Sequence, residues 1–151
     1  MYRSVELSPF GILKSKGRTK VWKTSLIIPA LGGSFDVVVH GTIEGPSMAQ
    51  TRMFSKLMDH SDDWCGKVAP KVVEFIRASH IAPPDVEVTA LNVWTLLTPE
   101  LIEVHEGHQY AHGESEPGTN AISIGYLTPW TEEQAIQIPF LNGKIGRIYS
   151  E

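Results

Sequence analysis

Apolar and β-branched residues recur at strand-like spacing in the first 41 positions of the chain. The segments 20–29 (KVWKTSLIIP) and 34–41 (SFDVVVHG) are both β-branched runs, and the loop between them contains two glycines. We therefore expect a β-hairpin here. The earlier run FGILK, followed by the turn-forming SKGRT, is consistent with one shorter strand before the hairpin.

The pattern then changes to a helical period. Ser47 is followed three residues later by Gln50, which is the capping-box spacing at a helix N-terminus. The apolar positions that follow recur every three or four residues and predict a helix over about 48–58. Ser47 is interpreted as the cap rather than as a nucleophile, because GPSMA lacks the second glycine of a nucleophile elbow.

A second helix is expected from about residue 68 to residue 79, after a break at 59–63. Pro70 is tolerated in a first helical turn and is costly deeper in a helix, so the start is placed near Lys67. A short third helix is favoured over about 89–96, although residues 86–90 also alternate as a strand would. A strand is expected after Thr98 and Pro99.

The C-terminal third alternates clearly. Residues 121–127 (AISIGYL) predict a strand with Ile122, Ile124 and Tyr126 on one face. Asn142-Gly143 lies between two further alternating runs and predicts a two-residue hairpin turn. This turn implies the cross-strand pairs Leu141–Lys144, Phe140–Ile145 and Ile136–Tyr149. Pro139 cannot donate to a strand ladder, so we expect it on an edge or at a bulge.

The order of these elements predicts the fold class. Strands come first, then two or three helices, then three or four strands. This segregation is typical of an α+β domain, with an antiparallel sheet of the N-terminal hairpin and the C-terminal strands packed against the helices. The length of 151 residues, with 42% hydrophobic and 20% charged residues, fits a single globular domain over 1–151.

Charge and cysteine content exclude several classes of function. The net charge of −4 predicts no nucleic-acid partner. No apolar run approaches the length of a membrane span, and the N-terminus lacks the apolar region of a signal peptide, so we expect a cytoplasmic protein. Cys65 is the only cysteine, which precludes an intramolecular disulfide, and its DDWCGK context favours a packed thiol over a nucleophile.

Three of the six histidines lie in VHEGHQYAHGES, residues 104–115. His108 and His112 have the spacing of a helical zinc motif, but Gln109 stands where that motif needs glutamate. Strand geometry would put His105 on the opposite face from the other two. A solvated loop is the favoured interpretation, with no cofactor. The alternative is a metal-binding protein or metal-dependent hydrolase that uses His105, His108 and His112.

The chain also resembles a group of small bacterial α+β domains. The pieces that carry the resemblance are the early FG, Trp22, GPSMAQ opening a helix, LLTPELIEV, and the closing PWTEEQAIQIPFLNGKIGRI. Those domains resemble immunity proteins of polymorphic toxin systems. The relatives often have Glu-His-Gly after the tryptophan, where this chain has TEEQA, so no role for that histidine is carried over.

No catalytic constellation is visible, so the expected function is that of a non-enzymatic interaction protein. The resemblance implies an immunity protein that binds and neutralises a cognate toxin. Acidic loops with aromatic anchors would meet a basic partner surface. The residues expected to make this contact are Asp59, Asp62, Asp63, Trp64, Glu106, Tyr110, Glu114 and Glu116. The oligomeric state stays open, and a possible edge strand at Pro139 suggests assembly as an alternative.

Overall fold

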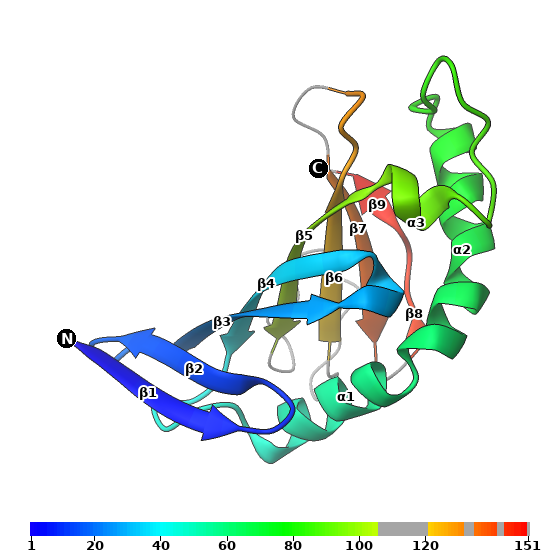
Figure 1. Ribbon diagram of the computed structural model, residues 1–151. Helices are drawn as coiled ribbons and strands as arrows, with labels where there is room; N and C mark the ends of the chain where they lie inside the picture. Colours follow the sequence, from blue (N-terminus) through cyan, green and yellow to red (C-terminus); the bar gives the residue numbers. More distant parts are fainter. Residues whose placement is uncertain (106–120, 132–134, 142–143, 151) are drawn as a thin grey trace.

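A computed structural model of the protein describes residues 1–105, 121–131, 135–141 and 144–150. The described residues form a mixed α+β fold in which nine strands make one sheet (Figure 1). The strands follow each other across the sheet in the order β1-β2-β3-β4-β5-β6-β7-β8, and β9 also pairs with β7. The helices lie between β4 and β5 in the chain, and Figure 1 shows α1 and α2 along one side of the sheet.

The N-terminal sheet contains the expected hairpin and one strand more than expected. The hairpin strands are β3 (Val21–Ile28) and β4 (Gly33–His40), joined by the short 3-10 helix η1 (Pro29–Leu31). The expected shorter strand is β2 (Gly11–Lys16). It pairs with β1 (Tyr2–Leu7), which the sequence analysis did not predict.

Helix α1 (Met48–Asp59) confirms the predicted cap. The Ser47 side chain accepts a hydrogen bond from the Gln50 backbone N–H, and the Gln50 side chain accepts one from the Ser47 backbone N–H. Both bonds satisfy N–H groups that the first turn of a helix leaves without partners. The N-terminal boundary of α1 is therefore set by local side-chain chemistry.

Helix α2 (Ser61–Ala78) begins earlier than the sequence analysis predicted, and Pro70 lies inside it. A proline removes the hydrogen bond to the carbonyl of residue i−4, here Gly66. Both Pro70 and Gly66 are exposed, so water can solvate that carbonyl. On the extra turns Cys65 is buried and Trp64 packs against the core, and this packing favours continuing the helix through Pro70.

The sheet is mixed, so the expectation of an antiparallel sheet was wrong at the connection that contains the helices. Helix α3 (Val93–Leu96) is a single turn, shorter than the expected 89–96, and leads into β5 (Thr98–His105). β5 pairs in parallel with β4, while the other strand pairs are antiparallel. A parallel neighbour needs a long connection, and residues 41–97 provide one.

The C-terminal hairpin follows the predicted register near its turn and departs from it further on. β6 (Ala121–Leu127) and β7 (Ala135–Leu141) pair along their length, and β8 (Lys144–Ile145) pairs with β7 as predicted. The pair Ile136–Tyr149 was wrong: β9 (Tyr149–Ser150) places Ser150 opposite Ile136. The return strand has one extra residue because it is interrupted between β8 and β9.

Pro139 explains this interruption. Its carbonyl accepts a hydrogen bond from the Gly146 N–H at 2.7 Å, so its nitrogen also faces the side of the broken return strand. The missing donor lies at an irregular point of the ladder, as expected for a bulge. β7 lies between β6 and β8/β9, so Pro139 does not mark an edge strand.

The core lies between the helices and one face of the sheet. Residues of β4 that face the helices are buried, as are the inward residues of β5, β6 and β7: Phe35, Val37, Val39, Ile102, Val104, Ile122, Ile124, Tyr126, Ile136, Ile138 and Phe140. Among the described residues no helix is long and apolar enough to cross a membrane.

Candidate functional site

The parallel pair β4–β5 brings together three side chains with metal-ligand chemistry. His40 is the last residue of β4, and Glu103 and His105 lie two apart on β5. The register pairs Val38 with Glu103 and Val39 with Val104. Because Val39 and Val104 face the core, the three polar residues share the opposite face of the sheet.

The three side chains contact each other directly. His40 Nε2 and Glu103 Oε2 are 3.0 Å apart, within hydrogen-bond distance. The rings of His40 and His105 stack with centroids 5.4 Å apart and an interplanar angle of 8°. Ser123 on β6 approaches from the other side, with its Oγ 3.5 Å from His105 Nε2.

Burial and charge set the protonation of this cluster. The hydrogen bond from His40 holds the pKa of Glu103 below its ordinary value, so the carboxylate is ionised at neutral pH. His105 is only 9% exposed, and this burial lowers its pKa. The buried ring is therefore neutral at neutral pH, which is the form of histidine that binds metal ions.

Gln50 ties this end of β4 to the helix layer. Its side-chain Nε2 donates to the His40 backbone carbonyl at 2.7 Å, while its Oε1 accepts from Ser47 in the capping box. Gln50 is 1% exposed. One buried side chain therefore fixes both the start of α1 and the backbone that carries His40.

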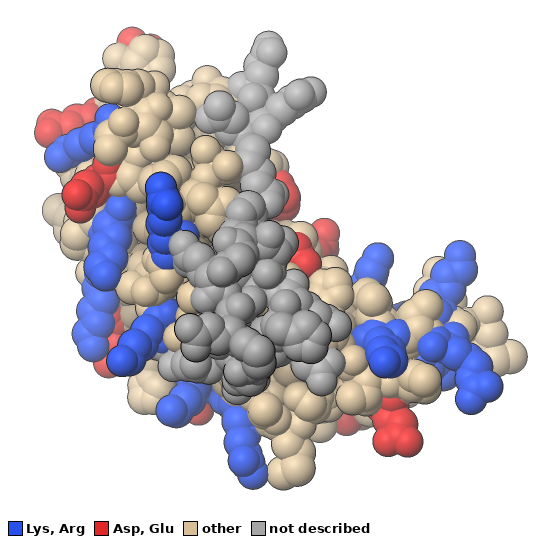
Figure 2. All heavy atoms as spheres, turned by 180° about the vertical axis from the view of Figure 1, so that it is seen from behind, with Lys and Arg blue, Asp and Glu red and all other residues tan. Residues whose placement is uncertain are grey.

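A second surface lies on the same side of the sheet, over β1, β2 and β3. The strand register places on this outward face the exposed side chains of Tyr2, Ile12, Lys14, Lys16, Lys23 and Ile27, together with those of Glu6 and Asp36. We call this set the wing face. Tyr2, Ile12 and Ile27 are 70%, 57% and 75% exposed. Figure 2 shows the lysines and arginines gathered over this extension of the sheet, on the right of that view.

The N-terminal segment that supplies most of the wing face is basic, although the whole chain is acidic. Residues 1–23 contain six of the 13 basic residues and one of the 17 acidic residues of the chain. Lys14 and Lys23 lie directly opposite each other across β2 and β3. In the described part of the chain neither of these lysines, nor Lys16, forms an ion pair. A hollow of about 510 Å³ lies beside them, lined by Ile12, Ser25, Asp36 and Leu101 among others.

Arg3 differs from these lysines because it is used internally. Its guanidinium lies 5.0 Å from the ring centroid of Trp22. It also donates to the backbone carbonyls of Gly17, Thr19 and Ile43. These contacts join the β1–β2 hairpin to the loop before α1, so Arg3 holds the hairpin in place.

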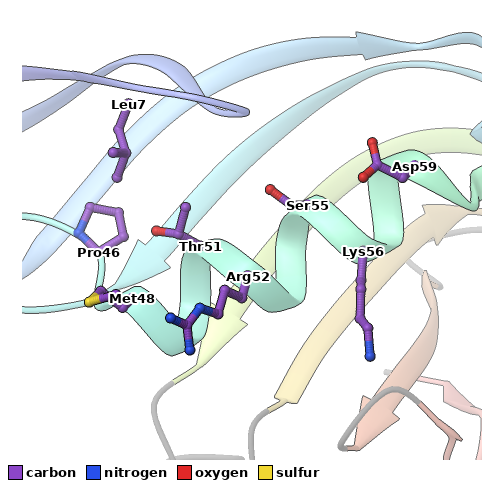
Figure 3. Close-up of a pocket in the computed structure, with 8 residues that line it drawn as sticks. All are labelled: Leu7, Pro46, Met48, Thr51, Arg52, Ser55, Lys56 and Asp59. Atoms are coloured by element: carbon purple, nitrogen blue, oxygen red, sulfur yellow. The ribbon is translucent and has the colours of Figure 1, made fainter.

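A further hollow of about 510 Å³ lies on the outer side of α1, shown in Figure 3. Thr51, Ser55 and Asp59 follow one another at four-residue spacing, and Arg52 and Lys56 form the neighbouring row. The lining residues are those of an ordinary solvated helix face, closed at one end by Leu7, Pro46 and Met48. The arrangement points to no particular ligand.

The residues expected to bind a partner are placed as follows. Asp59, Asp62 and Asp63 are exposed at the α1–α2 junction. Trp64 turns toward the core, where its ring centroid lies 4.7 Å from that of Phe140 and 5.9 Å from that of Trp94. Only part of its side chain is thus available as an anchor. The predictions for Glu106, Tyr110, Glu114 and Glu116 concern residues outside the described part of the chain.

The alternative metal set is also only partly described. His105 lies in the cluster with His40 and Glu103, whereas His108 and His112 are outside the described residues. No role for His40 or Glu103 was expected from the sequence. The two-residue spacing of Glu103 and His105 on an expected strand was an available signal, but the parallel pairing that adds His40 was not.

Cys65 is packed, as its sequence context indicated. Its thiol is buried and donates to the Ala30 carbonyl at 2.7 Å. Burial raises the pKa of the Cys65 thiol to about 12, with a further contribution from the charge of Asp62. Nucleophilic chemistry needs the thiolate, so this cysteine is inert in the folded protein.

Comparisons with protein-family models, with curated proteins and with solved structures find no match for this chain. The function is therefore argued from the geometry of the two surfaces on the outward face of the sheet.

Proposed function

We propose that this protein is a non-enzymatic interaction protein that binds an acidic surface of a partner protein through the wing face. The particular role we propose is that of an immunity protein, which neutralises a cognate toxin by occluding it. The observation that carries the proposal is the combination of lysines that form no ion pair with large exposed apolar side chains on one face of the described sheet.

The apolar side chains supply the affinity in this proposal. Tyr2, Ile12 and Ile27 are exposed well beyond what packing of the sheet requires. Exposed aromatic and aliphatic side chains rimmed by charge are typical of protein interfaces, where the apolar residues are buried and the charges steer approach. The proposed partner surface therefore has apolar pockets surrounded by carboxylates.

The opposed lysines supply a second argument. Like charges directly opposite on neighbouring strands cost about 0.2–1 kcal/mol of stability. Lys14 and Lys23 are opposed in this way. Local destabilisation of this kind, which the packing of the fold does not require, is typical of functional sites. In the proposed complex, carboxylates of the partner would offset the repulsion between the two lysines.

A protein fits this face better than a nucleic acid does. Nucleic-acid sites are strongly basic throughout, whereas Glu6 and Asp36 share this face with the lysines and the whole chain has a net charge of −4. In this proposal lysines of the protein contact an acidic partner, whereas the sequence-based expectation had acidic loops contacting a basic toxin. Asp59, Asp62 and Asp63 are therefore tested beside the wing face.

The test is a toxicity-rescue assay in which the protein is co-expressed with the product of the neighbouring gene. Three forms are compared: the wild type, the Lys14→Glu/Lys23→Glu variant and the matched Asp62→Lys/Asp63→Lys variant. Both variants change exposed side chains, and far-UV circular dichroism checks that each is folded. We expect rescue by the wild type and the aspartate variant, and loss of rescue by the lysine variant.

Three outcomes contradict the proposal in different ways. Absence of rescue and of binding by the wild type removes the immunity role. Loss of rescue by the aspartate variant alone moves the contact surface from the wing face to the α1–α2 junction. Tight binding of single-stranded or duplex DNA by the wild type, abolished by the lysine variant, would replace the protein partner with a nucleic acid.

A further inference from the structure

We infer that His40, Glu103 and His105 form a binding site for one divalent transition-metal ion of the zinc class. This site is separate from the wing face and does not depend on the proposed function.

The ligand atoms are already close enough to share an ion. One ligand atom from each of the three residues lies within 4.8 Å of the other two. Around a tetrahedral zinc ion with bonds of about 2.0–2.1 Å, ligand atoms are about 3.3 Å apart. His40 Nε2 and Glu103 Oε2 are 3.0 Å apart, close to the separation that a shared zinc ion requires.

The donor set selects the type of ion. Two imidazoles and one carboxylate suit zinc and other first-row transition metals, whereas magnesium and calcium prefer oxygen ligands alone. Two histidines and one glutamate are a known ligand set of zinc sites that leave a fourth position for water. His40 and Glu103 are each about one-third exposed, so an ion can reach the set from solvent.

The strands provide the rigidity that such a site needs. Glu103 and His105 project from one strand at i and i+2, and His40 projects from the neighbouring strand. The Gln50 side chain holds the His40 backbone, and the Ser123 hydroxyl lies 3.5 Å from the His105 ring. Contacts of this kind orient ligands in metal sites. The ion would cross-link the two strands that the long helical crossover joins.

The experiment uses untagged protein that has been dialysed against a chelator and then titrated with Zn²⁺ by calorimetry. Cobalt absorption spectra report the coordination geometry independently. The variants are His40→Ala and Glu103→Gln, both at partly exposed positions. The matched control is His60→Gln, because His60 is exposed at the α1–α2 junction and its side chain makes no capping hydrogen bond.

We expect one Zn²⁺ per chain for the wild type and for His60→Gln. His40→Ala and Glu103→Gln should each bind at least about 100-fold more weakly, because even a residue that only orients a ligand contributes about 10- to 100-fold. At a Zn²⁺ concentration 100 times the Kd, the melting temperature of the wild type should rise by about 5–10 °C, since the ion binds only the folded state.

A His108→Ala/His112→Ala variant completes the test. Stoichiometric binding that survives in this variant supports the assignment to His40, Glu103 and His105. Binding that is lost in this variant but unchanged in His40→Ala overturns it. Absence of stoichiometric Zn²⁺ and Co²⁺ binding by the wild type overturns it as well.

Discussion

Replacement of Gln50 should lower the stability of the protein by an amount that can be worked out from its hydrogen bonds. Its side chain makes two hydrogen bonds, one to the Ser47 N–H within the capping box and one to the His40 carbonyl on β4. The first bond is local to the helix and the second joins the helix layer to the sheet. Replacing Gln50 therefore tests whether the tertiary bond contributes beyond the cap.

The magnitude follows from the two bonds. A net hydrogen bond contributes about 1 kcal/mol, and a buried acceptor left without a partner costs about 1–3 kcal/mol. Gln50→Ala should therefore lower the free energy of unfolding by about 2–4 kcal/mol, since the His40 carbonyl also loses its donor. For a chain of this size about 3 kcal/mol corresponds to a fall in melting temperature of about 6–12 °C.

The assay is urea denaturation followed by circular dichroism and tryptophan fluorescence. Ser47→Ala is the matched control, because it removes only the cap bond and should cost about 1 kcal/mol. Gln50→Met keeps the side-chain volume and isolates the polar contribution. The reasoning is refuted if Gln50→Ala and Gln50→Met cost no more than Ser47→Ala, since the bond to β4 would then contribute nothing.

Three further predictions concern the lysine pair, two glycines and the thiol. Lys23→Glu should raise the free energy of unfolding by about 0.5–1 kcal/mol, because it converts the like-charge pair with Lys14 into an attractive one. This gain should shrink at high salt, which screens exposed charges. An unchanged denaturation midpoint at low salt would contradict the prediction. Gly41→Ala should lower the free energy of unfolding by more than about 2 kcal/mol, because its Cβ would lie 2.7 Å from the Gly45 carbonyl oxygen. Gly66→Ala, with open space around it in α2, should instead raise the free energy of unfolding by about 0.5–1 kcal/mol. The two glycine variants are compared by thermal denaturation, and equal melting temperatures would refute the contrast. Cys65, whose pKa is raised to about 12, should react with a thiol reagent at pH 8 only as fast as the protein unfolds; rapid modification without urea would show an accessible thiolate.

Features that depend on neighbours in the chain were predictable. The Ser47–Gln50 capping pattern and the Asn-Gly signal at 142–143 both depend on a few neighbouring residues, and the predicted start of α1 and pairing of Leu141 with Lys144 were correct, while the predicted turn itself lies outside the described residues. The errors came where distant contacts compete with local preference. Pro70 argued for a late start of α2, but burial of residues on the two turns before it outweighed the lost hydrogen bond.

The candidate sites show the same division. From the sequence, His105, His108 and His112 were the alternative metal ligands because they are close in the chain. Only the structure brings His40 next to His105, across 65 positions of sequence, since that contact depends on the parallel pairing of β4 and β5. The wing face was hidden for a related reason: the net charge of the whole chain conceals a basic N-terminal segment.

The sequence by itself therefore determined the α+β fold class, most of the elements and, for β6, the side of the strand that faces the core. These follow from periodicity and from short-range caps and turns, which act through residues that are neighbours along the chain. The tertiary structure decided which strands are adjacent, and with that which polar residues meet on the outward face. Strand pairing is governed by the packing of the whole domain, because hydrogen bonds between strands are alike and only the buried face distinguishes one partner from another.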